Sequence, residues 1–178
     1  MHILKYFLGI LLTVMLVFFI GGALINDEWQ VSRSLTIHAS PEKIYPFVSK
    51  FKEWEKWSPW NASKDATLKY TYEDTGAVVG SKQTWTSEKM GNGWMRFTDA
   101  SPETGVSYDL FIEMGQIQSS LQGNLAFTAV GEETHVTWTD RGHSGGSFVK
   151  RWISLLIKPM LGKDMEQGLS DLEHLVEK

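Results

Sequence analysis

The stretch SRSLTIHASPEKIYPFVSKFKEWEKWSPW, residues 32–60, is the part of the sequence that decides the fold. Its first part alternates apolar and polar side chains, with Leu35 and Ile37 on one face, as in a strand with one solvent-exposed face. Ser40 before Pro41 predicts a helix start, because Pro at the first helical position loses no backbone hydrogen bond. Aromatic residues at helical spacing follow. We therefore expect one strand and then two short helices.

Six further strands are predicted downstream of this stretch. Glycine-containing turns recur at hairpin spacing, and hairpins join antiparallel neighbours. Gly142 is expected to end the last strand, and a helix with one apolar side follows from residue 148 to residue 178. Pro159 is expected to kink or split that helix. The predicted strands cover residues 67–74, 81–88, 94–100, 106–113, 119–130 and 134–141.

The last helix needs a surface to cover. Met165, Leu169, Leu172 and Val176 form an apolar stripe along it. A curved antiparallel sheet of about seven strands offers a concave face, so the element order predicts an α+β domain over residues 29–178. Sheet and helix enclose a hollow unless large side chains fill it.

Residues 6–25 (YFLGILLTVMLVFFIGGALI) carry no charge. Twenty helical residues span about 30 Å, the thickness of a bilayer core, so we predict a transmembrane helix after a short tail of residues 1–5. Two alternatives remain open, a buried core helix and a cleaved signal peptide. Gly21 and Ala23 give the small-x-small pattern that cleavage requires.

The flanking charges predict how this helix is oriented. Lys5 precedes it, and Asp27 and Glu28 follow it. The positive-inside rule then places the tail in the cytoplasm and the domain outside, as in a single-pass protein of the cell membrane.

Composition argues against several classes of function. The chain has 178 residues and no Cys, which excludes disulfides, thiolate zinc sites, iron–sulfur clusters and a cysteine nucleophile. The net charge of −4 leaves no basic surplus for nucleic acid. The five histidines are scattered, and no phosphate-binding or dinucleotide-binding motif occurs. We expect neither a metal site nor a cofactor, and the sequence does not indicate an oligomeric state.

Alternation along the strands and helices suggests which side chains face the hollow. Arg96 is the charged candidate, either anchoring an anionic ligand head or pairing with Asp109 or Glu113. The predicted ligand-binding residues are Tyr70, Tyr72, Trp85, Arg96, Phe97, Tyr108, Leu110, Phe127, Trp138, Trp152, Leu156 and Met160.

Two further groups have more than one interpretation. Asp140, Arg141 and His143 lie near the end of the last strand and form either an acid/base group or a solvated loop. The tryptophans of residues 54–60 either line a portal or touch lipid, or they lock the short helices onto the sheet.

The order of these motifs resembles the polyketide cyclase/dehydrase and lipid-transport family of the START-like (SRPBCC) superfamily. The opening strand, the Ala-Ser-Pro-Glu turn and the Trp-Ser-Pro-Trp box at residues 57–60 are similar to the start of that family. Val79-Gly80 with Trp85, the segment 133–139 and the terminal helix are similar to its later parts. The resemblance covers about residues 30–177. It implies a helix-grip fold with a cavity for apolar ligands, but no single reaction.

Three functions follow as hypotheses. The first is a membrane-tethered domain that binds a small hydrophobic or lipid-like ligand without covalent chemistry. The second is a cyclase- or dehydratase-like enzyme that uses His143, Asp140 or Arg96 in the same cavity. The third is a structural or partner-binding module with a filled core.

Overall fold

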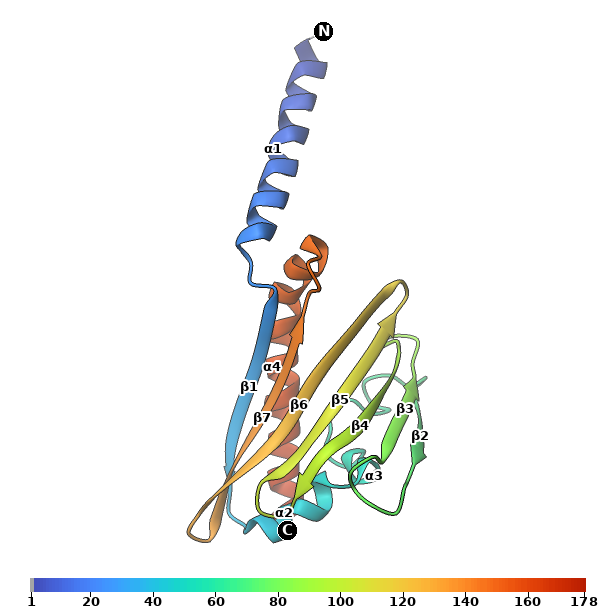
Figure 1. Ribbon diagram of the computed structural model, residues 1–178, viewed down its shortest axis with the longest axis vertical. Helices are drawn as coiled ribbons and strands as arrows, with labels where there is room; N and C mark the ends of the chain where they lie inside the picture. Colours follow the sequence, from blue (N-terminus) through green and yellow to red (C-terminus); the bar gives the residue numbers. More distant parts are fainter. Residues whose placement is uncertain (1) are drawn as a thin grey trace.

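The chain forms one seven-stranded antiparallel sheet, seen in a computed structural model that describes residues 2–178 (Figure 1). Its strand order is β1-β7-β6-β5-β4-β3-β2. The strands are β1 (Glu28–Ile37), β2 (Lys69–Glu73), β3 (Lys82–Thr86), β4 (Asn92–Ser101), β5 (Gly105–Met114), β6 (Ile117–Val130) and β7 (Glu133–His143). All seven predicted strands are present, which confirms the α+β helix-grip architecture.

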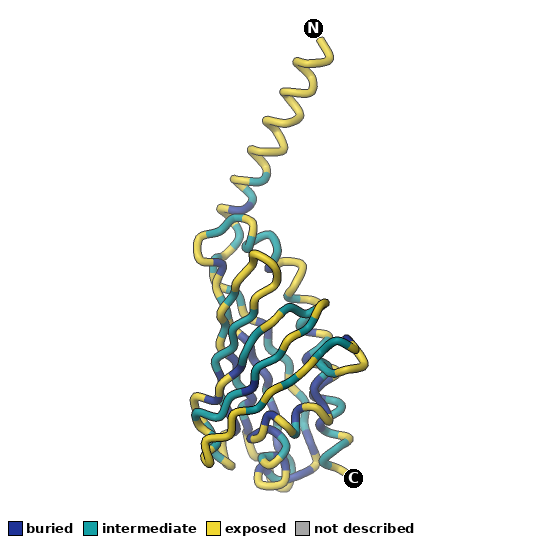
Figure 2. The backbone as a smooth tube through the Cα atoms, turned by 90° about the vertical axis from the view of Figure 1, so that its right-hand side faces the viewer, coloured by how far each residue is buried: buried dark blue, intermediate teal, exposed yellow. Residues whose placement is uncertain are grey.

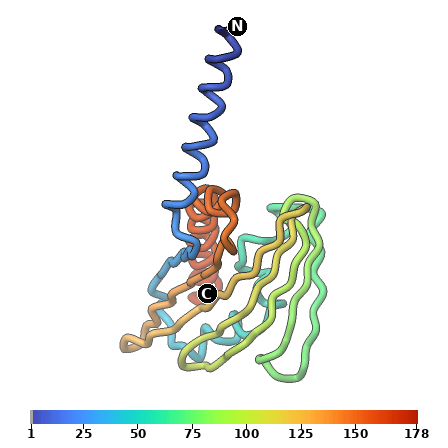
Figure 3. Tube along the Cα trace, turned by 45° about the horizontal axis from the view of Figure 1, so that its top comes forward, coloured from blue at the N-terminus to red at the C-terminus, as the bar shows by residue number. Residues whose placement is uncertain are grey.

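Four helices accompany the sheet: α1 (His2–Leu24), α2 (Pro41–Val48), α3 (Phe51–Trp54) and α4 (Phe148–Val176). The sheet bends around α4 and the two short helices, and α1 extends away from the domain (Figures 1 and 3). Met165, Leu169 and Leu172 of α4 are buried, as the predicted stripe requires.

Two details differ from the sequence prediction. Strand β7 continues through Gly142 to His143, because β1 pairs with it to the end and the Trp29 ring occupies the space over Gly142. Of the two outcomes expected at Pro159, a split does not occur, since α4 is one continuous helix, and a kink stays a prediction. Pro159 is exposed, so water can hydrogen-bond to the carbonyl that its missing N–H leaves free.

An aromatic cluster fills the space between the short helices and the sheet. The rings of Phe51 and Phe97 stack with centroids 3.8 Å apart. Trp54 lies edge-on to both Tyr108 and Trp138, at 5.6 and 5.9 Å. Buried residues are concentrated in this part of the domain, away from α1 (Figure 2).

The tryptophans of α3 therefore serve packing. The indole N–H of Trp54 donates to the Val48 carbonyl, and that of Trp57 donates to the Phe47 carbonyl. Both rings are buried, so neither Trp54 nor Trp57 lines a portal. The first bond holds α3 to the end of α2, and the second holds the Trp-Ser-Pro-Trp box to it.

Candidate functional site

An open groove of about 960 Å³ lies at the end of the domain that adjoins α1. Residues of β1, β4, β5, β6, β7 and α4 border it. That volume includes space along both faces of the sheet, because the residues that border it alternate between the faces. The register of the strands divides its side chains between the two faces of the sheet.

The inner part of the groove is apolar with one cation. Leu121 pairs with Leu110 on one side and with Gly142 on the other, so these positions share the face that carries the buried core. Trp29 lies over Gly142 on the same face. Lys158 of α4 completes this part, which we call the inner groove: Trp29, Leu110, Leu121 and Lys158.

The outer part of the groove is a polar row. Gln30, Arg141, Gln122 and Asp109 are cross-strand neighbours on the opposite face. The Gln122 amide donates to the Asp109 carboxylate at 3.2 Å. Trp94 of β4 borders the groove on the same outer face, half-buried and stacked on Phe111.

A buried hydrogen-bonded chain lies below the inner groove. The indole N–H of Trp138 donates to the Tyr108 hydroxyl at 2.8 Å, and that hydroxyl donates to Asp140 Oδ1 at 2.6 Å. Gly123 makes room for it, since a Cβ there would lie 2.2 Å from both the carboxylate and the Tyr108 ring. Burial raises the pKa of Asp140 to about 6, against the opposing effect of the Tyr108 hydrogen bond.

Four predicted lining residues prove to be core residues. Phe97, Tyr108, Phe127 and Trp138 are buried among other side chains and do not border the groove. The aromatic cluster thus fills the half of the hollow that we expected them to surround.

The predicted residues of β2 and β3 are half-buried beside that cluster. The Tyr70 hydroxyl donates to the Trp60 carbonyl at 2.6 Å, and the Tyr72 hydroxyl donates to Glu55 at 2.7 Å. Trp85 lies over Gly93 of the next strand. Leu110 is the one residue of the predicted set that borders the groove.

Four other predicted residues face elsewhere. Arg96 lies on the outer face, over the Trp94 ring and 3.7 Å from Asp109, because side chains alternate along β4 and Phe97 points inward. Trp152 packs against α1, where its indole N–H donates to the Phe18 carbonyl. Leu156 and Met160 are 70% and 67% exposed on α4. These four therefore do not surround the hollow.

The proposed acid/base residues do not converge either. Asp140 is buried on the inner face, whereas Arg141 and His143 are exposed. Arg141 belongs to the outer polar row, and His143 pairs with Glu28 in the β1–β7 register. Asp140 alone of the three points toward the interior.

Sequence reasoning missed three residues of the inner groove. Leu121 shares strand parity with Leu125, so the alternation in β6 already carried that signal. Trp29 shares parity with Val31 in the same way. Lys158 had no comparable signal, because a lysine in an amphipathic helix is usually solvated.

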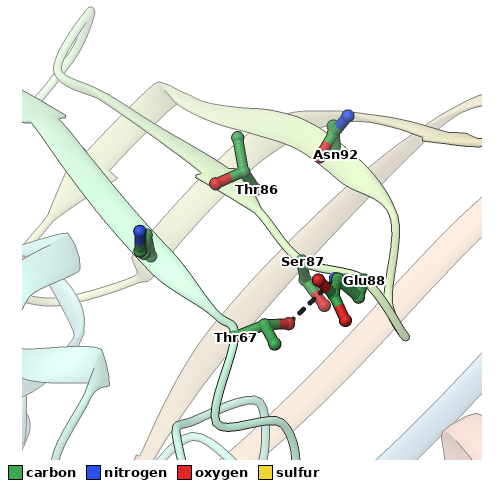
Figure 4. Close-up of a pocket in the computed structure, with 6 residues that line it drawn as sticks. Thr67, Thr86, Ser87, Glu88 and Asn92 are labelled. Carbon is green, nitrogen blue, oxygen red and sulfur yellow. Dashed lines mark hydrogen bonds between the residues drawn. The ribbon is translucent and has the colours of Figure 1, made fainter.

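A second, smaller hollow of about 420 Å³ lies between β2, β3 and the start of β4 (Figure 4). Thr67, Thr86, Ser87, Glu88 and Asn92 border it, and the Thr67 hydroxyl accepts from the Glu88 backbone N–H at 3.0 Å. Asp65 beside it accepts from Ser87, Thr67 and the Lys89 backbone, which lowers its pKa strongly. These bonds fasten the loop before β2 to the β3–β4 turn.

Within residues 2–178, no three His, Asp or Glu side chains lie close enough together to hold a metal ion. The inner groove itself contains only one ionisable side chain, Lys158.

The model of one protein family matches residues 28–177 of the chain, and that family is described as polyketide cyclase/dehydrase and lipid transport. The match covers the whole sheet and all of α4. No curated protein matches the sequence.

Solved structures with the same fold are distant in sequence. Norcoclaurine synthase from Thalictrum flavum, solved with dopamine and hydroxybenzaldehyde, is 16% identical with a TM-score of 0.59, covering 84% of this chain and 86% of its own. A protein from Thermus thermophilus is 17% identical with a TM-score of 0.57, covering 83% and 97%. Ara h 8.0201 is 11% identical with a TM-score of 0.55, covering 84% and 97%. These likenesses establish the fold.

Proposed function

Because the chain belongs to the polyketide cyclase/dehydrase and lipid-transport family, we propose that it is a membrane-tethered domain that binds a small hydrophobic or lipid-like ligand in the inner groove. Family and fold together support a ligand-binding domain of the SRPBCC superfamily. The tether, the ligand class and the place of binding are our proposal.

The observation that carries the proposal is the half-buried apolar surface of the inner groove. Trp29, Leu110 and Leu121 are neither packed away like the aromatic cluster nor polar like the outer row. A ligand that covers them removes apolar area from water, which favours binding by about 25 cal/mol per Å² before entropic costs. Lys158 at the edge offers a hydrogen-bond donor to a polar end.

The tether is supported by α1. Its 23 residues form the one helix of residues 2–178 that is long and apolar enough to cross a bilayer, and nearly all of its side chains are exposed. The inner groove lies at the same end of the domain, where a membrane-derived ligand would have the shortest path. With Lys5 before α1 and Asp27 and Glu28 after it, the domain lies outside the cytoplasm in this proposal.

The structure bears differently on the two alternatives. The structural-module alternative required a filled core. The aromatic cluster fills one half of the hollow, but the inner groove in the other half is open. The cyclase-like alternative required Asp140, His143 or Arg96 in the cavity. Of these, Asp140 alone lies on the inner face, without His143 or Arg96 beside it.

Photolabelling of the full chain in lipid nanodiscs tests the proposal. The probe is a fatty acid with a diazirine in its acyl chain, and cross-linked peptides are identified by mass spectrometry. We expect cross-links in α1 and also in β5 and β6 around Leu110 and Leu121. The variant Leu121→Glu places a charge in the groove and should abolish the β5 and β6 cross-links while those in α1 persist.

Thr128→Glu is the matched control, since it introduces the same charge at an exposed position on the other face of β6 that does not border the groove. Cross-links confined to α1 in the parent chain would refute ligand binding in the groove. An absence of cross-links in α1 would refute the tether.

A further inference from the structure

The joint between α1 and α4 is built from close contacts. Gly21 and Gly22 lie so near Trp152 and Phe148 that a Cβ at either position would approach a ring carbon to 2.5 or 2.8 Å. The rings of Phe19 and Phe148 are 5.6 Å apart, edge to face. The first turns of α4 therefore lie beside the last turns of α1.

Polar contacts close the same joint. Arg151 donates to the Asp27 carboxylate at 3.1 Å and to the Gly22 carbonyl at 3.2 Å. The backbone N–H of Gly146 donates to Asp27 as well, and with Arg151 it lowers the pKa of that carboxyl. The joint holds α4 at a fixed place relative to the end of α1.

An apolar stripe begins at this joint and is exposed at three of its four positions, with Ile153 half-buried. Val149, Ile153, Leu156 and Met160 follow the spacing i, i+4, i+7, i+11 and so share one side of α4. Ser154 and Met165, which are buried, lie on the opposite side of the helix. Val149 is 54% exposed, and Leu156 and Met160 are more exposed still.

We propose that this stripe lies in the interfacial layer of the bilayer, so that α4 is a second membrane contact beside α1. This inference rests on the proposed tether. If α1 spans the bilayer, Phe148 and Trp152 lie at its exit from the hydrocarbon core. Leu156 is then at most about 6 Å further along the helix. The headgroup layer on each side is about that thick.

The charges of α4 fit a membrane with anionic lipids. Residues 144–163 contain no Asp or Glu but contain Lys150, Arg151, Lys158 and Lys163, whereas residues 164–178 contain five acidic residues. Arg151 is paired with Asp27, Lys158 borders the inner groove, and Lys150 donates to the Gln118 carbonyl. Lys163 is the exposed cation beside the stripe, and the absence of acidic side chains over residues 144–163 leaves this half of α4 without charges that repel anionic headgroups. Lysine and arginine near an amphipathic helix attract anionic headgroups.

Spin labels on the full chain test the inference, because the native sequence has no Cys. The variants are Leu156→Cys on the stripe, Leu12→Cys inside α1, and Val130→Cys at the end of β6. Val130 is the matched control, since it is an equally exposed apolar residue at the other end of the sheet. Each is placed in nanodiscs of phosphatidylcholine and phosphatidylglycerol, and collision rates with oxygen and with a water-soluble nickel complex are measured.

We expect the ratio of oxygen to nickel collisions at position 156 to exceed that at position 130 severalfold, approaching the ratio at position 12. Equal ratios at 156 and 130, with a lipid-exposed label at 12, would overturn the inference and leave the tether standing. A water-exposed label at 12 would overturn the tether itself. Spin–spin broadening at 156 that disappears on dilution with unlabelled chain would show that a second copy covers the stripe, which also overturns the inference.

Discussion

Asp140 is a carboxyl group placed where water does not reach. Its side chain is 3% exposed, and Tyr108 supplies its hydrogen bond from a buried position. An ionised carboxylate in such a place loses hydration that one hydroxyl cannot replace. The neutral form is therefore favoured. The free energy lost when the buried carboxyl ionises makes the stability of the fold depend on pH.

Replacement of Asp140 by Asn should stabilise the protein at neutral pH. The folded-state pKa of about 6 lies above the unfolded value of 3.8, so folding favours the protonated group. The contribution of Asp140 to the free energy of unfolding is complete below pH 3.8. As the pH rises through 6, about 3 kcal/mol of this contribution is lost. Asp140→Asn keeps an acceptor for Tyr108 and removes this loss.

Urea unfolding of both proteins from pH 4 to pH 8 measures the effect. The free energy of unfolding of the variant should gain on the parent as pH rises and level off above the folded pKa. A difference between the two that stays constant over this range would show that the pKa of Asp140 is not raised in the folded protein.

Helix α4 illustrates what a pattern in sequence can and cannot establish about an element. The stripe of Met165, Leu169 and Leu172 predicted the buried half, because only one spacing places all three on the same side. Leu156 and Met160 are equally apolar, yet they belong to a different side of the helix. Hydrophobicity alone did not distinguish a side that faces the sheet from one that faces outward.

Strand β4 also shows a side-chain direction that was predicted wrongly from the sequence. Arg96 and Phe97 were both expected to face the hollow, although neighbours on a strand point to opposite faces. The register fixes which of the two is inside: Phe97 pairs with the buried Tyr108, and Arg96 pairs with Asp109. Strict use of the alternation would have removed Arg96 from the site.

At the joint between α1 and α4, Gly22→Leu should loosen the contact between anchor and domain. A Cβ there would lie 2.8 Å from the Phe148 ring and 3.2 Å from the Trp152 indole nitrogen, so a leucine requires these rings or the helix to shift. Spin labels at positions 12 and 130 report the distance between α1 and the sheet. We expect its distribution to broaden in the variant.

Gly9→Leu is the matched control, because nothing lies within 4 Å of a Cβ at that position in the same helix. Its distance distribution should equal that of the parent chain. Equal distributions in all three proteins would show that the joint does not fix the anchor.

In the molecule as a whole, the order of elements was predictable and the filling of the interior was not. Turn residues and alternation specify strands locally, so all seven were found from sequence. The hollow depends on how far aromatic rings from α3 reach across the sheet. That distance is set by tertiary packing between Phe51, Trp54 and Phe97, which no local pattern encodes.

The filled half should carry most of the stability. Trp54→Ala removes a ring that contacts α3 and the sheet at once, and we expect a loss of about 3–5 kcal/mol in the free energy of unfolding. Trp94→Ala on the outer face is the control and should cost much less, because Trp94 is only partly buried. Comparable losses from both variants in urea unfolding would contradict a core centred on Trp54.

The tight gathering of indoles has a spectroscopic consequence. Trp54 lies 4.9 Å from Trp57 and 5.9 Å from Trp138, centroid to centroid and at fixed mutual tilts. Electronic transitions of chromophores held this close couple, and a chiral arrangement of them produces paired bands of opposite sign in circular dichroism. Trp57 and Trp60 also lie within 6 Å of Trp138, so this signal reports whether the segment 54–60 remains packed against the sheet.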